Sequence, residues 1–120
     1  MTDEHRYVGM IADKEFGDLP RPVLDELVGE VMHGDPPSVA GLADRLTLHP
    51  RNLRRVFGRV DPWWPMTPSE AIRYLRAARY AYWRNRPQKP SKLEAARLAG
   101  WASARSADEA HQATHGYPAP

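Results

Sequence analysis

The chain has 120 residues, 42% of them apolar and 27% charged, with a formal net charge of +2. This length suits one compact domain or two small subdomains that share a helix, and the apolar content is too high for a disordered chain. The absence of cysteine excludes disulfides, thiolate catalysis, iron–sulfur clusters and cysteine-ligated zinc. No apolar run reaches the roughly 20 residues that cross a bilayer. The charged N-terminus leads into no signal-type stretch, so we expect a cytoplasmic protein without membrane contact.

The basic residues are concentrated in the middle of the chain. Residues 1–50 hold 4 basic and 10 acidic residues, residues 51–90 hold 10 and 2, and residues 91–120 hold 3 of each. Fourteen of the 17 basic residues are arginine, which suits phosphate and base-edge recognition better than lysine does. This central excess of +8 is typical of a surface that binds a polyanion, and a solvated arginine-rich helix is the evenly weighted alternative.

The first third of the chain predicts one clear helix. Residues 1–20 are expected to form an N-terminal arm with a single helical turn at 7–12. After Pro20, apolar residues recur at helical spacing until Gly34 and the two prolines behind it end the pattern. The expected buried stripe consists of Val23, Leu24, Leu27, Val28 and Val31.

The next segment predicts two short helices joined by about three residues. Ser38 is expected to cap a helix over 39–46, and Pro50 fits the first turn of a second helix that runs to about Arg59. The second helix has a narrow apolar stripe and an arginine-rich outer surface. This arrangement is typical of a helix-turn-helix. The outward residues are Arg51, Asn52, Arg54, Arg55 and Arg59, and the stripe is Leu53, Val56 and Phe57.

A long helix is predicted after the proline-rich loop. Thr67 can cap it, Pro68 fits its first position, and Glu70 completes a capping box. The helix should run to about Asn85, before Pro87. The face toward the core is expected to hold Ile72, Leu75, Ala78 and Tyr82.

The last segment predicts a second pair of short helices. Ser91 and Glu94 form another capping box, and this helix should end near Gly100 with Leu93, Ala96 and Leu98 buried. A final helix over about 104–115 follows. Because strand-like alternation is nearly absent, we expect an all-α fold of two helix-turn-helix subdomains joined by a long linker helix. The expected parts are 1–20 (arm), 21–66 (first subdomain), 67–87 (linker helix) and 88–120 (second subdomain).

This order of helices resembles the DNA-binding domain of AraC/XylS-type transcriptional regulators over about residues 21–119. The resemblance implies a bacterial or phage protein, associated with the nucleoid, in which each unit places a recognition helix in the major groove. Five pieces in register carry it: Ser38-Val39-x-x-Leu42-Ala43-x-x-Leu46, His49-Pro50-Arg51-x-Leu53-x-Arg55-x-Phe57, Thr67-Pro68, Ala95-Ala96-x-x-Ala99-Gly100-Trp101, and Gly116-Tyr117-Pro118-Ala119-Pro120.

The resemblance also implies which residues touch DNA. Residues 50–59 become the first recognition helix, and arginine there can bond guanine O6 and N7 at two points. For Arg55, an internal salt bridge with Asp44 or Glu26 is an equal alternative. The expected base contacts are Arg51, Asn52, Arg54 and Arg55, and the expected phosphate contacts are Ser38, Arg59, Arg73 and Arg76.

The second unit departs from the family pattern. The two aromatic core positions of its last helix fall on Ala107 and His111, and the basic contact position falls on Glu109, beside Asp108. Carboxylates repel phosphates, so we expect this unit to bind DNA less strongly than the first. Its remaining candidate contacts are Arg105 and Ser106.

Two other features are candidates for a function. Trp63 and Trp64 lie in an unusually long loop, where at least one ring should pack and the other is a candidate partner contact. His111 and His115 have a spacing that can bind metal, but packed or solvated histidines are the favoured interpretation. No phosphate loop, nucleophile elbow or metalloprotease motif is present, so we expect no enzyme, cofactor or metal.

The sequence therefore predicts a sequence-specific transcriptional regulator of AraC/XylS type. Its expected partner is double-stranded DNA, contacted mainly by residues 50–59, with RNA polymerase or another regulator and a homodimer as further partners. The alternative is a protein-interaction module on the same scaffold that modulates another regulator or RNA polymerase.

Overall fold

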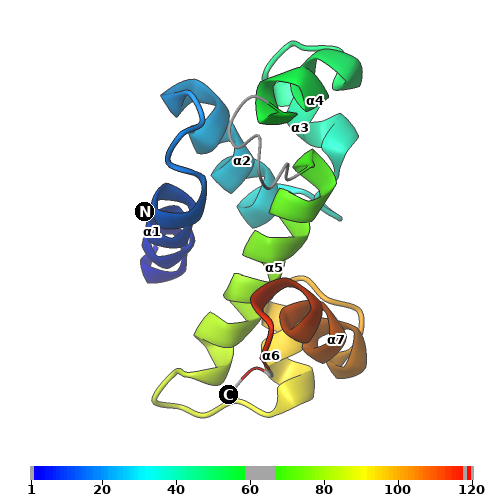
Figure 1. Cartoon of the computed structure of the whole chain (residues 1–120). Helices are drawn as coiled ribbons and strands as arrows, with labels where there is room; N and C mark the ends of the chain where they lie inside the picture. The colour runs from blue at the N-terminus through cyan, green and yellow to red at the C-terminus, as the bar shows by residue number, and fades with distance from the viewer. Residues whose placement is uncertain (1, 59–66, 118, 120) are drawn as a thin grey trace. The chain divides into compact units, whose positions relative to one another are not determined.

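The computed structural model describes residues 2–58, 67–117 and 119. Over these residues the protein is all-α, which confirms the predicted fold class (Figure 1). The chain divides into two compact units, Met1–Ile72 and Arg73–Pro120. None of the helices within the described residues is long and apolar enough to cross a membrane. The helices are α1 (Asp3–Phe16), α2 (Arg21–His33), α3 (Val39–Arg45), α4 (Pro50–Gly58), α5 (Pro68–Arg84), α6 (Lys92–Leu98) and α7 (Ala104–His115).

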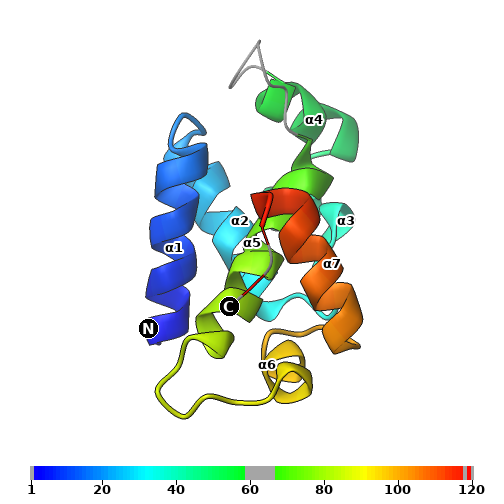
Figure 2. The ribbon, with the colours of Figure 1, turned by 60° about the horizontal axis from the view of Figure 1, so that its bottom comes forward.

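The N-terminal segment is a full helix, longer than the arm with one turn that the sequence predicted. Thr2 caps α1, because its hydroxyl accepts a hydrogen bond from the His5 backbone N–H at 3.1 Å. Val8, Ala12 and Phe16 then recur every four residues and are buried. This narrow stripe packs α1 against α2, and Figures 1 and 2 show the two helices side by side.

The helices α2 to α4 complete most of the first unit. The predicted stripe of α2 is buried, from Val23 to Val31. Ser38 caps α3 as expected, since its hydroxyl accepts from the Gly41 N–H at 2.9 Å. Helix α3 packs against both α2 and α4. Leu42 of α3 and Leu53 of α4 are fully buried, so the apolar sides of both short helices face the core of this unit.

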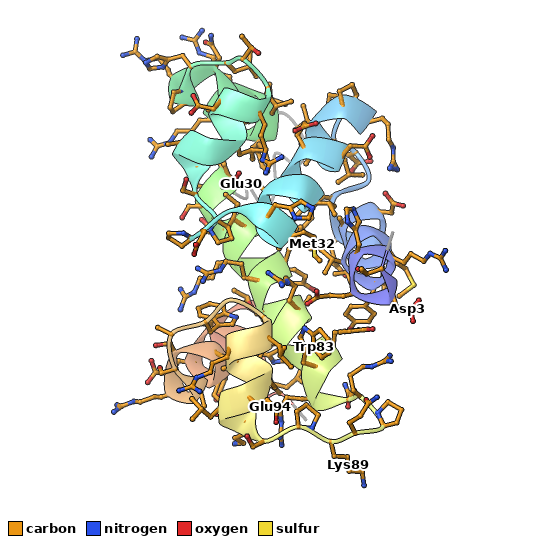
Figure 3. All side chains as sticks on the ribbon, turned by 180° about the vertical axis from the view of Figure 1, so that it is seen from behind. Asp3, Glu30, Met32, Trp83, Lys89 and Glu94 are labelled. Carbon is orange, nitrogen blue, oxygen red and sulfur yellow. The ribbon has the colours of Figure 1, made fainter. Side chains whose placement is uncertain are left out.

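The second unit has a small core rich in alanine. Tyr80 of α5 lies among buried alanines of α6 and α7, with Trp83 and Trp101 packed against them. Ser91 caps α6 as predicted, and Ser103 caps α7. Figure 3 labels Trp83 on α5 and Glu94 on α6. The buried alanines are Ala95, Ala96, Ala99 and Ala107.

The two leucines of α6 do not face this core. The sequence predicted Leu93 and Leu98 as buried, but 46% and 43% of their surfaces are exposed. Ala95, Ala96 and Ala99 are buried instead, so the inward face of α6 is its small-residue face. Two short helices pack closely when alanines meet, and that close packing leaves the longer leucines on the outside.

Candidate nucleic-acid interface

A tight connection joins α3 to α4. Leu46 ends α3, and the Leu48 N–H donates to the Ala43 carbonyl at 2.9 Å. Thr47 turns the chain with a φ of 54°, in the left-handed region that β-branched residues rarely adopt. The turn brings α4 back against α3, as the helix-turn-helix interpretation requires.

His49 supplies the first hydrogen-bond acceptor of α4. Its ring nitrogen Nδ1 accepts from the Arg51 backbone N–H at 3.1 Å, and its carbonyl accepts from the Asn52 N–H at 2.9 Å. The imidazole nitrogen thus performs the capping task that hydroxyl oxygens perform at Thr2 and Ser38. This cap was not among the predicted ones, although a side-chain acceptor directly before Pro50 was its signal.

The predicted base contacts share the outer surface of α4. Arg51, Asn52, Arg54 and Arg55 are all exposed, whereas Leu53 is fully buried and Phe57 is 3% exposed. The helical repeat of 3.6 residues explains this division. The apolar stripe holds α4 in the unit and turns the polar residues outward.

The arginines of α4 are available to a ligand. The side chains of Arg51, Arg54 and Arg55 make no ion pair with any residue that the structure describes. The internal salt bridge considered for Arg55 belongs to another arginine, because Arg45 lies 3.9 Å from Glu26. A base contact by Arg55 stays a prediction.

A buried carboxylate holds α3 in place below this surface. Glu30 of α2 is 4% exposed, and its Oε2 accepts from the Ser38 backbone N–H at 2.9 Å. Its Oε1 accepts from Arg45 Nε at 2.8 Å. One side chain therefore contacts both ends of α3 (Figure 3 labels Glu30). Local sequence does not indicate that Glu30 is buried, because its partners lie 8 and 15 residues away.

The predicted phosphate contacts lie in different surroundings. Ser38 and Arg73 are exposed, and Arg59 lies outside the described residues. Arg76 is only partly exposed: its Nη2 donates to the Gly100 carbonyl at 3.2 Å, and its guanidinium lies 4.2 Å from the centre of the Trp101 ring. Burial, and then the nearby charge of Arg79, lower the pKa of Arg76. Arg76 thus stabilises the second unit, and its phosphate contact stays a prediction.

The arginines that follow Arg76 on α5 also bind backbone carbonyls. Arg79 donates to the Leu98 carbonyl at 3.1 Å, and Arg84 donates to the Pro90 carbonyl at 3.0 Å. Leu98 ends α6, whose last carbonyls have no partner within the helix. Much of the positive charge of this helix therefore stabilises the second unit.

The outer surface of α7 is nearly neutral. Arg105 Nε lies 3.0 Å from Glu109 Oε1, one helical turn away, and the Ser106 N–H donates to the Ser103 hydroxyl. Both Arg105 and Ser106 are exposed. The structure thus pairs the one predicted basic contact of this helix with the carboxylate that occupies the family's basic position.

The unusual core positions of α7 are buried and bonded. Ala107 is fully buried and His111 is 2% exposed. His111 Nδ1 lies 2.8 Å from the Tyr117 carbonyl, and its ring stacks on His115 at 4.4 Å. His115 Nε2 lies 3.1 Å from the Tyr74 carbonyl. The two stacked rings therefore each lie within hydrogen-bonding distance of a backbone carbonyl. No group of three metal-binding side chains occurs in the described part of the chain.

Asp108, the other carboxylate of α7, faces its own unit. It accepts from the Tyr80 hydroxyl at 2.9 Å, and Lys92 Nζ lies 3.4 Å away. Burial raises the pKa of Tyr80 to about 12, and the hydrogen bond to Asp108 and its charge add to the shift. The phenol therefore keeps its proton to a higher pH in the folded protein than an ordinary tyrosine does.

We expect Tyr80→Phe to flatten the alkaline loss of stability. In the native protein, the protonated Tyr80 phenol contributes to the free energy of unfolding. This contribution is complete below the ordinary pKa of 10.0 and is lost as the pH rises from there to about 12. Two pKa units correspond to roughly 3 kcal/mol. Urea unfolding at a series of pH values should show the wild type losing more stability than Tyr80→Phe above pH 10, after a cost of about 1 kcal/mol for the variant at pH 7. Parallel curves would contradict this account.

Trp63 and Trp64, the last of the predicted site residues, lie outside the described residues. Comparison of the chain with protein-family models, with curated proteins and with solved structures finds no match. The likeness to AraC/XylS-type regulators therefore depends on the residues of this chain alone.

Proposed function

We propose that this protein is a sequence-specific DNA-binding transcriptional regulator of AraC/XylS type that reads the major groove mainly with α4. The observation that carries the proposal is the exposed arginine surface of α4, held by a buried stripe and paired with no described acid. A guanidinium can bond both acceptors of guanine, so Arg51, Arg54 and Arg55 have the chemistry for base recognition. Asn52 adds a group that suits adenine.

Two exposed polar residues outside α4 support the same function. Ser38, at the start of α3, is exposed and suits a phosphate contact. Arg73 is an exposed arginine on α5 and is the second such candidate. In a helix-turn-helix, contacts of this kind orient the recognition helix without reading the sequence.

The second unit contributes less to DNA binding in this proposal. The Arg105–Glu109 pair leaves α7 without net positive charge at its expected contact position. Counterion release provides much of the affinity for DNA, and a neutral surface releases few counterions. The first unit therefore provides most of the binding free energy.

Fluorescence anisotropy with a random-sequence duplex, repeated across a salt series, tests the proposal directly. Neutralising about five phosphates predicts a log–log slope of Kd against salt near 4 to 5 in magnitude. A slope of this size would justify selecting the preferred site from a random library. No binding at low salt would refute DNA recognition by this chain.

The second candidate function is a protein-interaction module that acts on another regulator or on RNA polymerase. The exposed Leu93 and Leu98 of α6 favour it, because both are large apolar side chains that the core does not use. Under this function, Leu93→Ser and Leu98→Ser abolish regulation in cells, whereas changes at Arg51 and Arg54 have no effect.

A further inference from the structure

The first unit has a surface groove between α1 and α2 that the proposed function does not use. Its volume is about 630 Å3. Leu24 and Val28 of α2 contribute apolar side chains that are almost fully buried. Along α1 the lining includes Arg6, Gly9, Met10 and Asp13, which follow one another at helical spacing. The groove therefore exposes one face of α1 along most of the helix.

In the middle of this face, a large exposed side chain lies next to a glycine. Met10 is a large apolar side chain with 57% of its surface exposed. Gly9 beside it has no side chain, and a Cβ placed there would meet no atom within 4 Å. A second helix that crosses here can insert a side chain over Gly9 while it receives Met10.

The two ends of the groove carry opposite charge. At one end, Asp13 and Asp25 share a single cation, because Arg21 lies 2.7 Å from Asp13 and 3.4 Å from Asp25. At the other end, Arg6 is exposed and forms no ion pair with the residues that the structure describes. One end thus has one carboxylate in excess and the other has one guanidinium in excess.

We propose that a second copy of this chain occupies the groove, with the two α1 helices antiparallel about a two-fold axis between Gly9 and Met10. An antiparallel pair centred there places residue 6 of one copy opposite residue 13 of the other, and residue 10 opposite residue 9. Arg6 of each copy then meets the acidic end of its partner, and each Met10 covers the partner's Gly9. A two-fold interface uses one patch twice, so the patch must complement itself, as this one does.

Charge and shape together select this occupant. A partner that only filled the apolar floor would not need opposite charges at the two ends, spaced equally about Gly9 and Met10. The surface offered by one helix pair is small, so we expect a reversible dimer with a micromolar Kd. The proposal does not depend on DNA binding, and either proposal can fail without the other.

Charge exchange between two variants gives the sharpest test. In Arg6→Asp the proposed dimer brings two carboxylates together at each end of the interface, and in Asp13→Arg it brings two guanidinium groups together there. A mixed dimer of the two variants restores an attractive arrangement, because one copy then carries only acidic and the other only basic side chains at these two positions. Sedimentation velocity of the full chain at about 100 µM should show a dimer for the wild type, monomers for each variant alone, and dimers again in the equimolar mixture.

Two further variants separate the interface from the fold. Gly9→Gln fills the hole where the partner's Met10 would lie, while its Cβ meets nothing within the chain. We expect it to weaken dimerisation tenfold or more and to leave the monomer's Tm unchanged or slightly raised, because glutamine favours helix over glycine. Lys14→Asp is the matched control, since it reverses a positive charge on α1 at an exposed position outside the groove.

Three results would overturn the proposal. The first is a wild type that stays monomeric at about 100 µM, where a micromolar dimer would be nearly complete. The second is a dimer that persists in Arg6→Asp, Asp13→Arg and Gly9→Gln, because another surface would then hold it. Monomeric variants that stay monomeric when mixed would also refute the predicted pairing of Arg6 with Asp13.

Discussion

Replacing Arg51 and Arg54 together with alanine should reduce affinity for the preferred DNA site about 100-fold or more. A two-point contact between arginine and guanine contributes about 1 to 3 kcal/mol of discrimination, and the loss of two such contacts adds up. Both side chains are exposed and make no ion pair with the described residues, so their removal leaves the packing of α4 intact. Alanine also favours helix at least as well as arginine does. Anisotropy titrations at fixed salt measure the loss.

The loss of DNA affinity can be assigned to the two arginines only if the double variant still folds. Leu53 and Phe57 carry the packing of α4, and neither is changed. We therefore expect the Tm of the double variant to stay within a few degrees of the wild type. The matched control is Lys14→Ala with Arg97→Ala, which removes the same charge from two exposed positions outside the candidate interface. It should bind DNA nearly as tightly as the wild type.

Lysine at the same positions separates charge from recognition. Arg51→Lys with Arg54→Lys keeps the positive charge but loses the planar two-point donor. We expect binding to random DNA to change little and the preference for the selected site to fall at least tenfold. Equal affinity of the alanine variant and the wild type would reject α4 as the reading helix.

Replacing Glu30 with alanine should destabilise the first unit by about 2 to 3 kcal/mol. The change leaves the Ser38 backbone N–H without its acceptor and Arg45 without its buried carboxylate. Removal of one partner from a buried ion pair costs about 3 to 5 kcal/mol, but a third of the Arg45 side chain is exposed and can be rehydrated. Urea unfolding with a probe in the first unit measures the loss.

Gly41 provides an internal check on the Glu30 account. A Cβ at Gly41 would overlap Glu30 Oε2, and that carboxylate cannot move without breaking its two hydrogen bonds. Gly41→Ala should therefore destabilise the wild type. In the Glu30→Ala background the obstacle is gone, and the same change should stabilise α3 by up to about 1 kcal/mol.

The opposite effects of Gly41→Ala on stability in the two backgrounds are specific to the contact between Gly41 and Glu30. If Gly41→Ala has the same effect in both backgrounds, the close approach of α2 and α3 is not what requires glycine. A double-mutant cycle with Arg45→Ala gives a second measure, because two residues in contact should show non-additive costs. Additive costs would mean that Arg45 does not depend on Glu30.

Helix boundaries were largely predictable because the signals that set them are local. Ser38, Thr67 and Ser91 each accept a backbone N–H three residues ahead, at 2.9 to 3.2 Å. The final helix spans Ala104–His115, as the sequence predicted. The exception is α1. Its buried stripe is only three residues, Val8, Ala12 and Phe16, spaced four apart among charged residues, so the apolar pattern is weak in the sequence. The stability of α1 depends on its packing against α2, and the sequence of α1 alone does not show that contact.

The exposed surface of α4 was predictable for a similar reason. The arginines alternate with an apolar stripe at the helical repeat, so burying Leu53 and Phe57 forces Arg51, Arg54 and Arg55 outward. Which other arginines stay available was not predictable. Those of α5 look alike in sequence, yet Arg79 and Arg76 reach carbonyls 19 and 24 residues away.

The sequence by itself determined most of the helices, their caps and the polar surface of α4, because each depends on residues within one or two turns. Only the tertiary structure decided which charges serve the fold. Glu30 is buried because α3 returns across α2, and Asp108 faces Tyr80 because α7 packs against α5. A charged group in a small core is stable only with partners from other helices, and their positions exist only after the chain has folded.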